Sequence, residues 1–383
     1  MIDNTTPQPR ASWLRLAIDD LRHRPSGNVP ALDLLRCVAI LLVLFQHTGE
    51  KFGLLSFGWT GVDLFFILSG FLIGGQLIKE LRRTGTLNVG IFILRRGLRI
   101  WPLYYFWVVA LLVMAYLEGK ESLLDQVRNF APDLLCVSNY FGQKLLGGWS
   151  LSTEEQFYVA VPLVLLFATK FVSTGRLILL PIAWLVIQPL LRISVLRAGS
   201  GKFEVYTPFH LHSEGLALGL LFAWVSPYVL ALGWRKCLLV CTSVVPIVLS
   251  LRWLNHDAFT YTGWTYAYGA ATLLALQVPA RAMRALEWKG IYILSRLSYG
   301  VYLNHRFLIE KSTALAQKFA GLGLPGFVIW SMVALMLSMG IAFLTFAVVE
   351  APFLRMRDRW LEARRAKVNP AHEHAGQELV GRS

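Results

Sequence analysis

The sequence predicts an all-α, polytopic integral membrane protein with about ten transmembrane helices and both termini in the cytoplasm. Hydrophobic residues make up 55% and charged residues only 16% of the 383 residues, and the mean hydropathy is +0.52. A soluble globular domain carries about 25% charged residues. The apolar excess is spread along nearly the whole chain, which indicates many membrane spans rather than one large soluble core.

Several apolar runs have roughly the 17–25 residues that an α-helix needs to cross a bilayer. The predicted spans cover about 31–50, 59–78, 100–117, 155–172, 178–196, 209–229, 236–252, 260–278, 291–310 and 327–350. They form one membrane domain over 31–355, between cytoplasmic tails at 1–30 and 356–383. Residues 1–30 are polar and basic and lack the features of a cleavable signal peptide, so we expect the first span to remain as a membrane helix.

The distribution of basic residues predicts the orientation and excludes nucleic acid as a partner. The formal net charge is +14, but the charges are dispersed over the loops between apolar runs. When the spans are alternated, 25 of the 37 Lys and Arg residues fall on one side. Because cytoplasmic loops are rich in Lys and Arg, this bias places both termini and the loop at 79–99 in the cytoplasm.

The first span, LDLLRCVAILLVLFQH, contains Arg36 and His47. The two residues are eleven positions apart, which corresponds to a rotation of about 1100° around an α-helix. The two side chains therefore share one face and lie about 16 Å apart along the helix axis. An arginine at the centre of a span raises the free energy of membrane insertion by about 2.5–3.5 kcal/mol, so it usually faces a protein interior or a polar cavity. Two interpretations stay open. Either Arg36 pairs with Asp33 and His47 is a polar interface residue, or the face lines a channel with a cation at its inner end and a base at its outer end.

The second span, GWTGVDLFFILSGFLIGG, places Asp63 and Ser69 among aromatic residues. Gly70 and Gly74 form a small-xxx-small pair in the same run. Such a pair is typical of closely packed membrane helices, so we interpret the two glycines as packing residues.

The predicted cytoplasmic loop ends in FILRRGLRIWPLYYF, which leads from Arg96 and Arg99 into a span that contains Tyr104. Arginine forks match phosphate oxygens with two parallel hydrogen bonds, so these residues are candidates for a phosphate clamp. An ordinary basic anchor with an aromatic belt is the alternative.

The segment GGWSLSTEEQFYVAVP lies on the predicted outer side. Ser152 and Glu155 fit a capping box, so part of this motif is the start of a helix. That function does not explain Trp149, Ser150 or Glu154.

Taken in order, these motifs resemble the membrane-bound acyltransferase family 3, which includes bacterial polysaccharide and Nod-factor O-acetyltransferases. The resemblance rests on LDLLRCVAILLVLFQH, GVDLFFILSGFLIGG, RRGLRIWPLYY, WSLSTEEQFY, SYGVYLNH and VVEAPF. It covers about residues 30–355, and the ordered series is more specific than any one motif.

The resemblance implies transfer of an acyl group, usually acetyl, from cytoplasmic acyl-CoA to a hydroxyl of a glycan or related acceptor. It also implies a multi-pass protein of the bacterial cytoplasmic (inner) membrane. The family's catalytic histidine corresponds to His47 and its paired arginine to Arg36. The arginines of the RxxR motif correspond to Arg96 and Arg99, and the glutamate of the WSLSxE motif corresponds to Glu154.

The sequence departs from the family pattern at several positions. Asn304 stands in YLNH where YLWH is common, and Arg306 follows it. Ala351 stands in EAPF where an arginine is common, and His212 and Glu214 replace an arginine and an acid in HLHSEGLALG. These departures leave the identity of the acceptor open.

In the mechanism that we expect, His47 deprotonates an acceptor hydroxyl as the hydroxyl attacks the thioester. Glu154 is the first candidate and Asp63 the second for the carboxylate that orients or stabilises the imidazole. A covalent acyl-histidine is the competing route.

Donor and acceptor groups are assigned to two further sets of residues. The acyl-CoA donor set is Arg36, Arg96, Arg99, Tyr104 and Ser69. The set that binds or supports the acceptor is Trp149, Ser150, His212, Glu214 and His305. We expect acyl-CoA as a co-substrate, no permanently bound cofactor and no metal, because His210, His212 and Glu214 are joined by no further ligand set of recognisable spacing.

Two other classes of function remain possible on the sequence: a transporter or flippase of a polysaccharide precursor, and a membrane sensor without catalysis. Intramembrane charges and broken helices suit a transporter, but the sequence shows no pair of matching halves. Consumption of acyl-CoA distinguishes an enzyme from both. The acceptor remains open among an exopolysaccharide, a lipid-linked sugar, a Nod-type oligosaccharide and a small metabolite.

Overall fold

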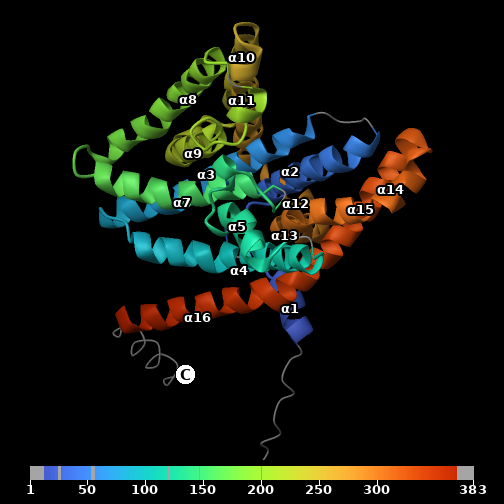
Figure 1. Ribbon diagram of the computed structural model, residues 1–383. Coiled ribbons are helices and arrows are strands. Elements are labelled where there is room, and N and C mark those ends of the chain that lie inside the picture. The colour runs from blue at the N-terminus through green and yellow to red at the C-terminus, as the bar shows by residue number, and fades with distance from the viewer. Residues whose placement is uncertain are drawn as a thin grey trace, which may run out of the picture.

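The computed structural model describes residues 13–24, 27–52, 57–119, 121–145, 147–199 and 201–368. In these ranges the regular structure is entirely helical, without a strand, which confirms the predicted all-α class (Figure 1). The elements are α1 (Trp13–Arg22), α2 (Pro30–Gly49), η1 (Glu50–Phe52), η2 (Gly58–Thr60), α3 (Gly61–Thr84), α4 (Val89–Leu117), α5 (Leu123–Leu134), α6 (Ser138–Phe141), α7 (Gly148–Ala168), η3 (Thr174–Ile178), α8 (Leu179–Arg197), η4 (Lys202–Val205), α9 (Glu214–Leu232), α10 (Trp234–Ser250), η5 (Leu251–Trp253), α11 (His256–Leu276), α12 (Ala280–Ala285), α13 (Lys289–Lys311), α14 (Thr313–Ala320), α15 (Gly323–Thr345), η6 (Phe346–Glu350) and α16 (Ala351–Val368).

Within the described ranges, seven helical segments are long and apolar enough to cross a membrane. They are Pro30–Gly49, Gly58–Thr84, Val89–Leu117, Gly148–Ala168, Thr174–Arg197, Glu214–Leu232 and Gly323–Arg364. These segments fit a multi-pass membrane protein. The count of ten is not confirmed, and the side of the membrane on which the termini lie stays a prediction.

The other three predicted spans form helices that are not both long and apolar enough to cross a membrane by the same criteria. Helix α10 has 17 residues, α11 is rich in Tyr, Thr and Gly, and α13 carries charges along its length. Helix α13 packs against α2 and α15, and Asn304 and His305 in its middle are buried. A helix inside the bundle does not need an apolar surface all round, because it contacts protein rather than lipid.

The pairing of α3 with α9 depends on small residues. A Cβ atom on Gly70 would lie 2.1 Å from the carbonyl oxygen of Leu216, and one on Gly219 would lie 2.2 Å from that of Ile67. A Cβ on Gly74 would lie 2.8 Å from a side-chain atom of Leu220. The two backbones therefore approach closely, as the small-xxx-small pair predicts.

Helix α15 continues through the π-helical turn η6 into α16, and α16 lies beside α4 (Figure 1). The tail predicted from residue 356 is therefore helical as far as Val368. Its remaining part lies outside the described residues.

Candidate active site

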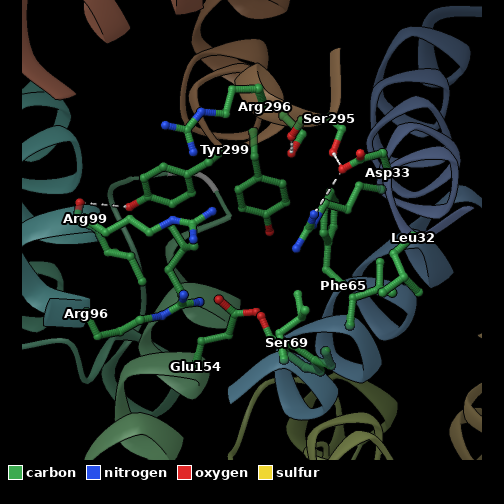
Figure 2. A pocket seen from close by; sticks show the side chains of 18 of the residues that line it. Leu32, Asp33, Phe65, Ser69, Arg96, Arg99, Glu154, Ser295, Arg296 and Tyr299 are labelled. Carbon is green, nitrogen blue, oxygen red and sulfur yellow. Dashed lines mark hydrogen bonds and ion pairs between the residues drawn. The ribbon is translucent and has the colours of Figure 1, made fainter. Parts of the chain in front are cut away.

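A cavity of about 310 Å³ lies between α2, α3, α4, α7 and α13 (Figure 2). We call it the arginine cavity, because four arginines line it: Arg36, Arg96, Arg99 and Arg296. Its carboxylates are Asp33, Glu154 and Glu350. The cations therefore exceed the carboxylates by one, and the cavity suits an anionic ligand.

Arg36 is positioned by Asp33, one turn earlier on α2. The Asp33 carboxylate is buried, with 2% of its surface exposed. It accepts hydrogen bonds from Ser295 at 2.7 Å, from Asn28 at 2.7 Å and from Arg36 at 3.3 Å. Both interpretations of the first span therefore hold for Arg36, which pairs with Asp33 and also lines a cavity.

Tyr158 connects three of the sequence-predicted residues at this cavity. Its hydroxyl accepts a hydrogen bond from Arg96 at 2.8 Å, donates to Glu154 at 2.9 Å and lies 3.2 Å from the hydroxyl of Ser69. The Arg96 guanidinium also lies 4.5 Å from the centroid of the Tyr158 ring. Sequence reasoning missed Tyr158, although its place four residues after Glu154 puts both side chains on one helix face.

Arg99 and Arg296 complete the basic lining from α4 and α13. Figure 2 shows both side chains reaching into the same space as Arg96 and Glu154. Sequence reasoning did not single out Arg296, so its place in the cavity is a finding of the structure. Because α13 carries it beside α2, only the tertiary packing brings Arg296 near Arg36.

Tyr104 does not line this cavity. Its hydroxyl donates to the carbonyl oxygen of Asp133 at 2.8 Å, and 1% of its surface is exposed. It therefore joins α4 to α5, and the structure gives it no contact with the space that the arginines surround.

A second cavity, of about 520 Å³, lies at the other end of α2. We call it the histidine cavity. Its lining is Val43, Gln46, His47, Glu50, Trp59, Val62, Gln143, Gly147, Trp149, Tyr206, His256, Asp257, Thr260, Tyr261, Tyr302, His305 and Arg306. Val62 and Tyr302 line both cavities, so the two spaces adjoin at these residues.

Two charged side chains meet one ring nitrogen of His47. The Nδ1 atom lies 2.9 Å from Oε1 of Glu50 and 2.7 Å from Nη1 of Arg306. The carboxylate beside His47 is therefore Glu50, whereas Glu154 lines the arginine cavity and Asp63 bonds elsewhere. Glu50 lies three residues after His47, a spacing that sequence reasoning had available and did not use.

His305 lies beside His47 with the ring centroids 5.2 Å apart. Its Nδ1 is 2.7 Å from the carbonyl oxygen of Tyr302. A carbonyl oxygen only accepts, so Nδ1 carries the proton and a neutral His305 has its lone pair on Nε2. This Nε2 is buried and has no hydrogen-bond partner among the described residues.

The start of α7 separates the two cavities. Trp149 lines the histidine cavity and the next residue, Ser150, lines the arginine cavity. The Ser150 hydroxyl lies 2.6 Å from that of Tyr302. Trp149 and Ser150 therefore stand at the boundary between the cavities.

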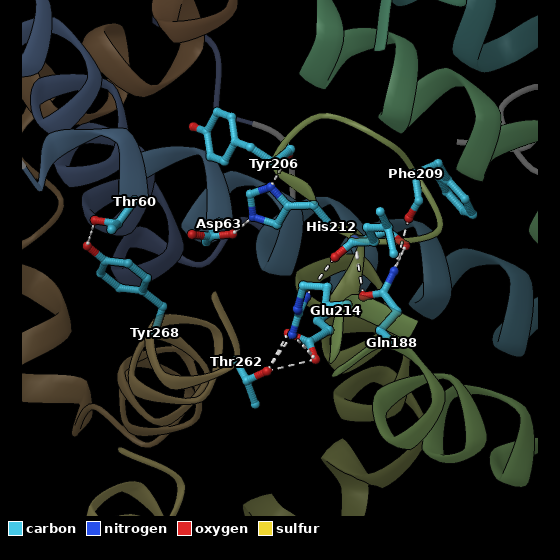
Figure 3. Close-up of polar contacts among 12 residues, drawn as sticks. Thr60, Asp63, Gln188, Tyr206, Phe209, His212, Glu214, Thr262 and Tyr268 are labelled. Carbon is cyan, nitrogen blue, oxygen red and sulfur yellow. Dashed lines mark hydrogen bonds and ion pairs between the residues drawn. The ribbon is translucent and has the colours of Figure 1, made fainter. Parts of the chain in front are cut away.

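Asp63, His212 and Glu214 are buried outside both linings, where they take part in two polar clusters (Figure 3). His212 lies 2.7 Å from Asp63 through Nε2, and Glu214 forms an ion pair of 2.9 Å with Arg192. Their side chains are at most 1% exposed. The ring of His212 stacks 5.5 Å from that of Trp149, so the cluster of His212 and Asp63 supports the wall of the histidine cavity from behind.

Comparison with known protein families identifies the family to which this chain belongs. The profile described as "Acyltransferase domain" matches residues 29–349, a range that contains the four arginines and both neighbouring histidines. The chain belongs to this acyltransferase family. The resemblance inferred from the ordered motifs is thereby confirmed.

Curated relatives of the chain include bacterial O-acetyltransferases. The O-acetyltransferase OatA of Staphylococcus aureus (strain NCTC 8325 / PS 47) is 29% identical over 303 residues, which are 72% of this chain and 50% of that protein. The peptidoglycan O-acetyltransferase OatA of Listeria monocytogenes is 26% identical over 316 residues, 76% of this chain and 50% of the relative. The putative peptidoglycan O-acetyltransferase YrhL of Bacillus subtilis is 29% identical over 318 residues, with the same coverage of 76% and 50%.

The chain spans about half the length of these relatives. No solved structure matches it.

Proposed function

We propose that the protein transfers an acyl group, acetyl in the first instance, from acyl-CoA to a hydroxyl of a glycan. The observation that carries this proposal is the junction of the two cavities at Val62 and Tyr302. One cavity offers several arginines to an anion, and the other offers an imidazole among aromatic side chains. A transporter does not require this division.

In the arginine cavity, Arg36, Arg96 and Arg99 bind the phosphates of acyl-CoA, because guanidinium forks match phosphate oxygens. These arginines lie at the end of the bundle that the positive-inside bias assigns to the cytoplasm. The thin pantetheine arm extends past Ser150 and Tyr302 and presents the thioester to His47.

In the histidine cavity, His47 acts as the general base. The acceptor oxygen attacks the thioester carbonyl while Nε2 of His47 takes the hydroxyl proton, the C–O bond forms, and the C–S bond breaks. The proton then passes to the departing sulfur, and free CoA leaves. Glu50 stabilises the imidazolium form, and an acyl-histidine intermediate is the alternative route.

The acceptor is a sugar of the cell envelope, and peptidoglycan is the first to test, because two relatives carry that substrate in their names. Aromatic side chains form much of the wall of the histidine cavity: Trp59, Trp149, Tyr206 and Tyr261. Flat apolar faces of this kind suit the face of a sugar ring. The proposed location is the bacterial cytoplasmic membrane.

The test is release of free CoA from acetyl-CoA, and transfer to soluble peptidoglycan fragments, by purified wild-type protein beside His47→Ala and Arg99→Ala. We expect wild-type turnover, none in His47→Ala, and a much higher donor requirement in Arg99→Ala. If wild-type protein neither binds nor consumes acetyl-CoA and the three proteins behave alike, the proposal fails and transport becomes the leading function.

A further inference from the structure

The two partners of His47 Nδ1 cannot be satisfied together. The guanidinium of Arg306 only donates hydrogen bonds, so its contact of 2.7 Å requires a bare nitrogen. The carboxylate of Glu50 only accepts, so its contact of 2.9 Å requires a proton on the same nitrogen. One nitrogen has one of these states at a time.

The choice of partner decides what the opposite ring nitrogen does. When Arg306 donates to Nδ1, neutral His47 carries its proton on Nε2 and cannot take another there. When Nδ1–H donates to Glu50, Nε2 has the lone pair that a general base needs. The Arg306 contact thus describes a resting form of His47, and the Glu50 contact describes the competent form.

Arg306 also has two carboxylates within reach. Its guanidinium lies 3.7 Å from Glu50 and 3.5 Å from Glu310, and 26% of its side chain is exposed. It also lines a neighbouring groove between α4, α5 and α13 as well as the histidine cavity. A small rotation of the side chain exchanges the imidazole for a carboxylate without leaving the cation unpaired.

We propose that Arg306 is a positioning residue that holds His47 in the resting tautomer and competes with Glu50 for its Nδ1. This inference rests on the proposed function. In the reactive form Arg306 pairs with the carboxylates, Nδ1–H of His47 donates to Glu50, and Nε2 receives the acceptor's hydroxyl proton. The imidazolium returns that proton to the sulfur as the C–S bond breaks.

The titratable groups around His47 come from four elements. From η1, α13, α11 and the loop before α9 the cavity receives Glu50, Tyr302, His305, Arg306, His256, Asp257, Tyr261 and Tyr206. Within this set, Arg306 and Glu50 are the charged groups that lie within hydrogen-bond distance of the imidazole. Loss of the Arg306 cation and loss of the Glu50 carboxylate therefore change the electrostatic potential at His47 in opposite directions.

The experiment measures the pH profile of acetyl-CoA turnover in wild type, Arg306→Gln, Arg306→Lys and Glu50→Gln. Because a cation beside the base is lost, we expect the acidic limb of the Arg306→Gln profile to lie at higher pH than that of wild type, by roughly one unit. Loss of the carboxylate shifts the limb of Glu50→Gln to lower pH by a similar amount. Arg306→Lys keeps the charge and restores most of the wild-type position. Lys311→Gln removes another cation of α13, which is paired with Glu118 at the end of α4, and we expect no shift.

A second measurement does not depend on activity. Diethyl pyrocarbonate modifies unprotonated imidazole, and mass spectrometry of the peptide that contains His47 gives the pH midpoint of its modification. We expect this midpoint to move in the same directions as the acidic limbs in the Arg306 and Glu50 variants.

If the wild type turns over acetyl-CoA but the pH profiles and modification midpoints of the variants superimpose on those of the wild type, the proposed role of Arg306 is wrong while the proposed function stands. Absence of turnover in the wild type overturns the proposed function, and the proposed role of Arg306 falls with it.

Discussion

The arginine cavity and the histidine cavity adjoin at Tyr302 and Val62, but their polar groups are held in different ways. In the arginine cavity, Asp33 accepts three hydrogen bonds, and the Tyr158 hydroxyl connects its neighbours. In the histidine cavity, two partners compete for one atom of His47. The first arrangement favours tight, preorganised binding of a ligand, and the second allows a proton to change position during a reaction.

The largest expected effect tests whether the buried ion pair between Glu214 and Arg192 is structural. Glu214→Gln leaves the Arg192 cation buried and without its anion, which we expect to destabilise the protein by about 3–5 kcal/mol. Thermal unfolding in detergent measures this loss beside Glu362→Gln, an exposed control on α16. An unchanged unfolding temperature combined with lost acceptor transfer would instead assign Glu214 to the acceptor site.

The next effect concerns the arginine cavity, where hydrogen bonds hold the polar groups in place. Arg96→Ala removes a phosphate ligand, so we expect the KM for acetyl-CoA to rise about 10–100-fold. Arg95→Ala is the matched control, because Arg95 is the adjacent arginine, is exposed and does not line the arginine cavity. Equal effects of the two substitutions in steady-state kinetics would contradict a specific clamp.

A smaller effect is expected at His305, whose Nε2 lone pair has no partner among the described residues. If it accepts a hydrogen bond from the sugar, His305→Gln slows acceptor transfer about tenfold and leaves donor binding unchanged. His210→Gln serves as the control, because His210 bonds Tyr140 and does not line the histidine cavity. A weakened affinity for acetyl-CoA in His305→Gln would show that the division between the cavities is wrong.

The smallest effect tests the connection through Tyr158. Tyr158→Phe keeps the ring under Arg96 and removes the hydroxyl that joins it to Glu154, so we expect the donor KM to rise about 3–10-fold. Tyr105→Phe removes a hydroxyl that bonds the backbone of Leu134, and we expect wild-type kinetics. A donor KM unchanged in both variants would leave the hydroxyl without a function in donor binding.

The sequence predicted the parts of the site that depend on one helix. Helical periodicity placed Arg36 and His47 on one face, and both line a cavity, each at its own end of α2. Small residues predicted the close approach of α3 at Gly70. The carboxylate beside His47 was assigned to Glu154 or Asp63, whereas the structure puts Glu50 there.

Other features depend on packing between distant helices and leave little trace in one sequence. Asp63 and His212 look like site residues because charges in apolar runs mark both functional sites and buried ion pairs. Only the contact between α3 and the loop before α9 shows that they bond each other. Arg296 and Arg306 likewise reach the cavities because α13 lies inside the bundle.

The most direct test of the two-cavity account is equilibrium binding of radiolabelled acetyl-CoA to the purified protein, measured together with its turnover. The account predicts that His47→Ala binds the donor as wild type does and does not consume it, whereas Arg36→Ala loses about tenfold or more in affinity. Loss of donor binding in His47→Ala, or unchanged binding in Arg36→Ala, would contradict the separation of donor recognition from proton transfer.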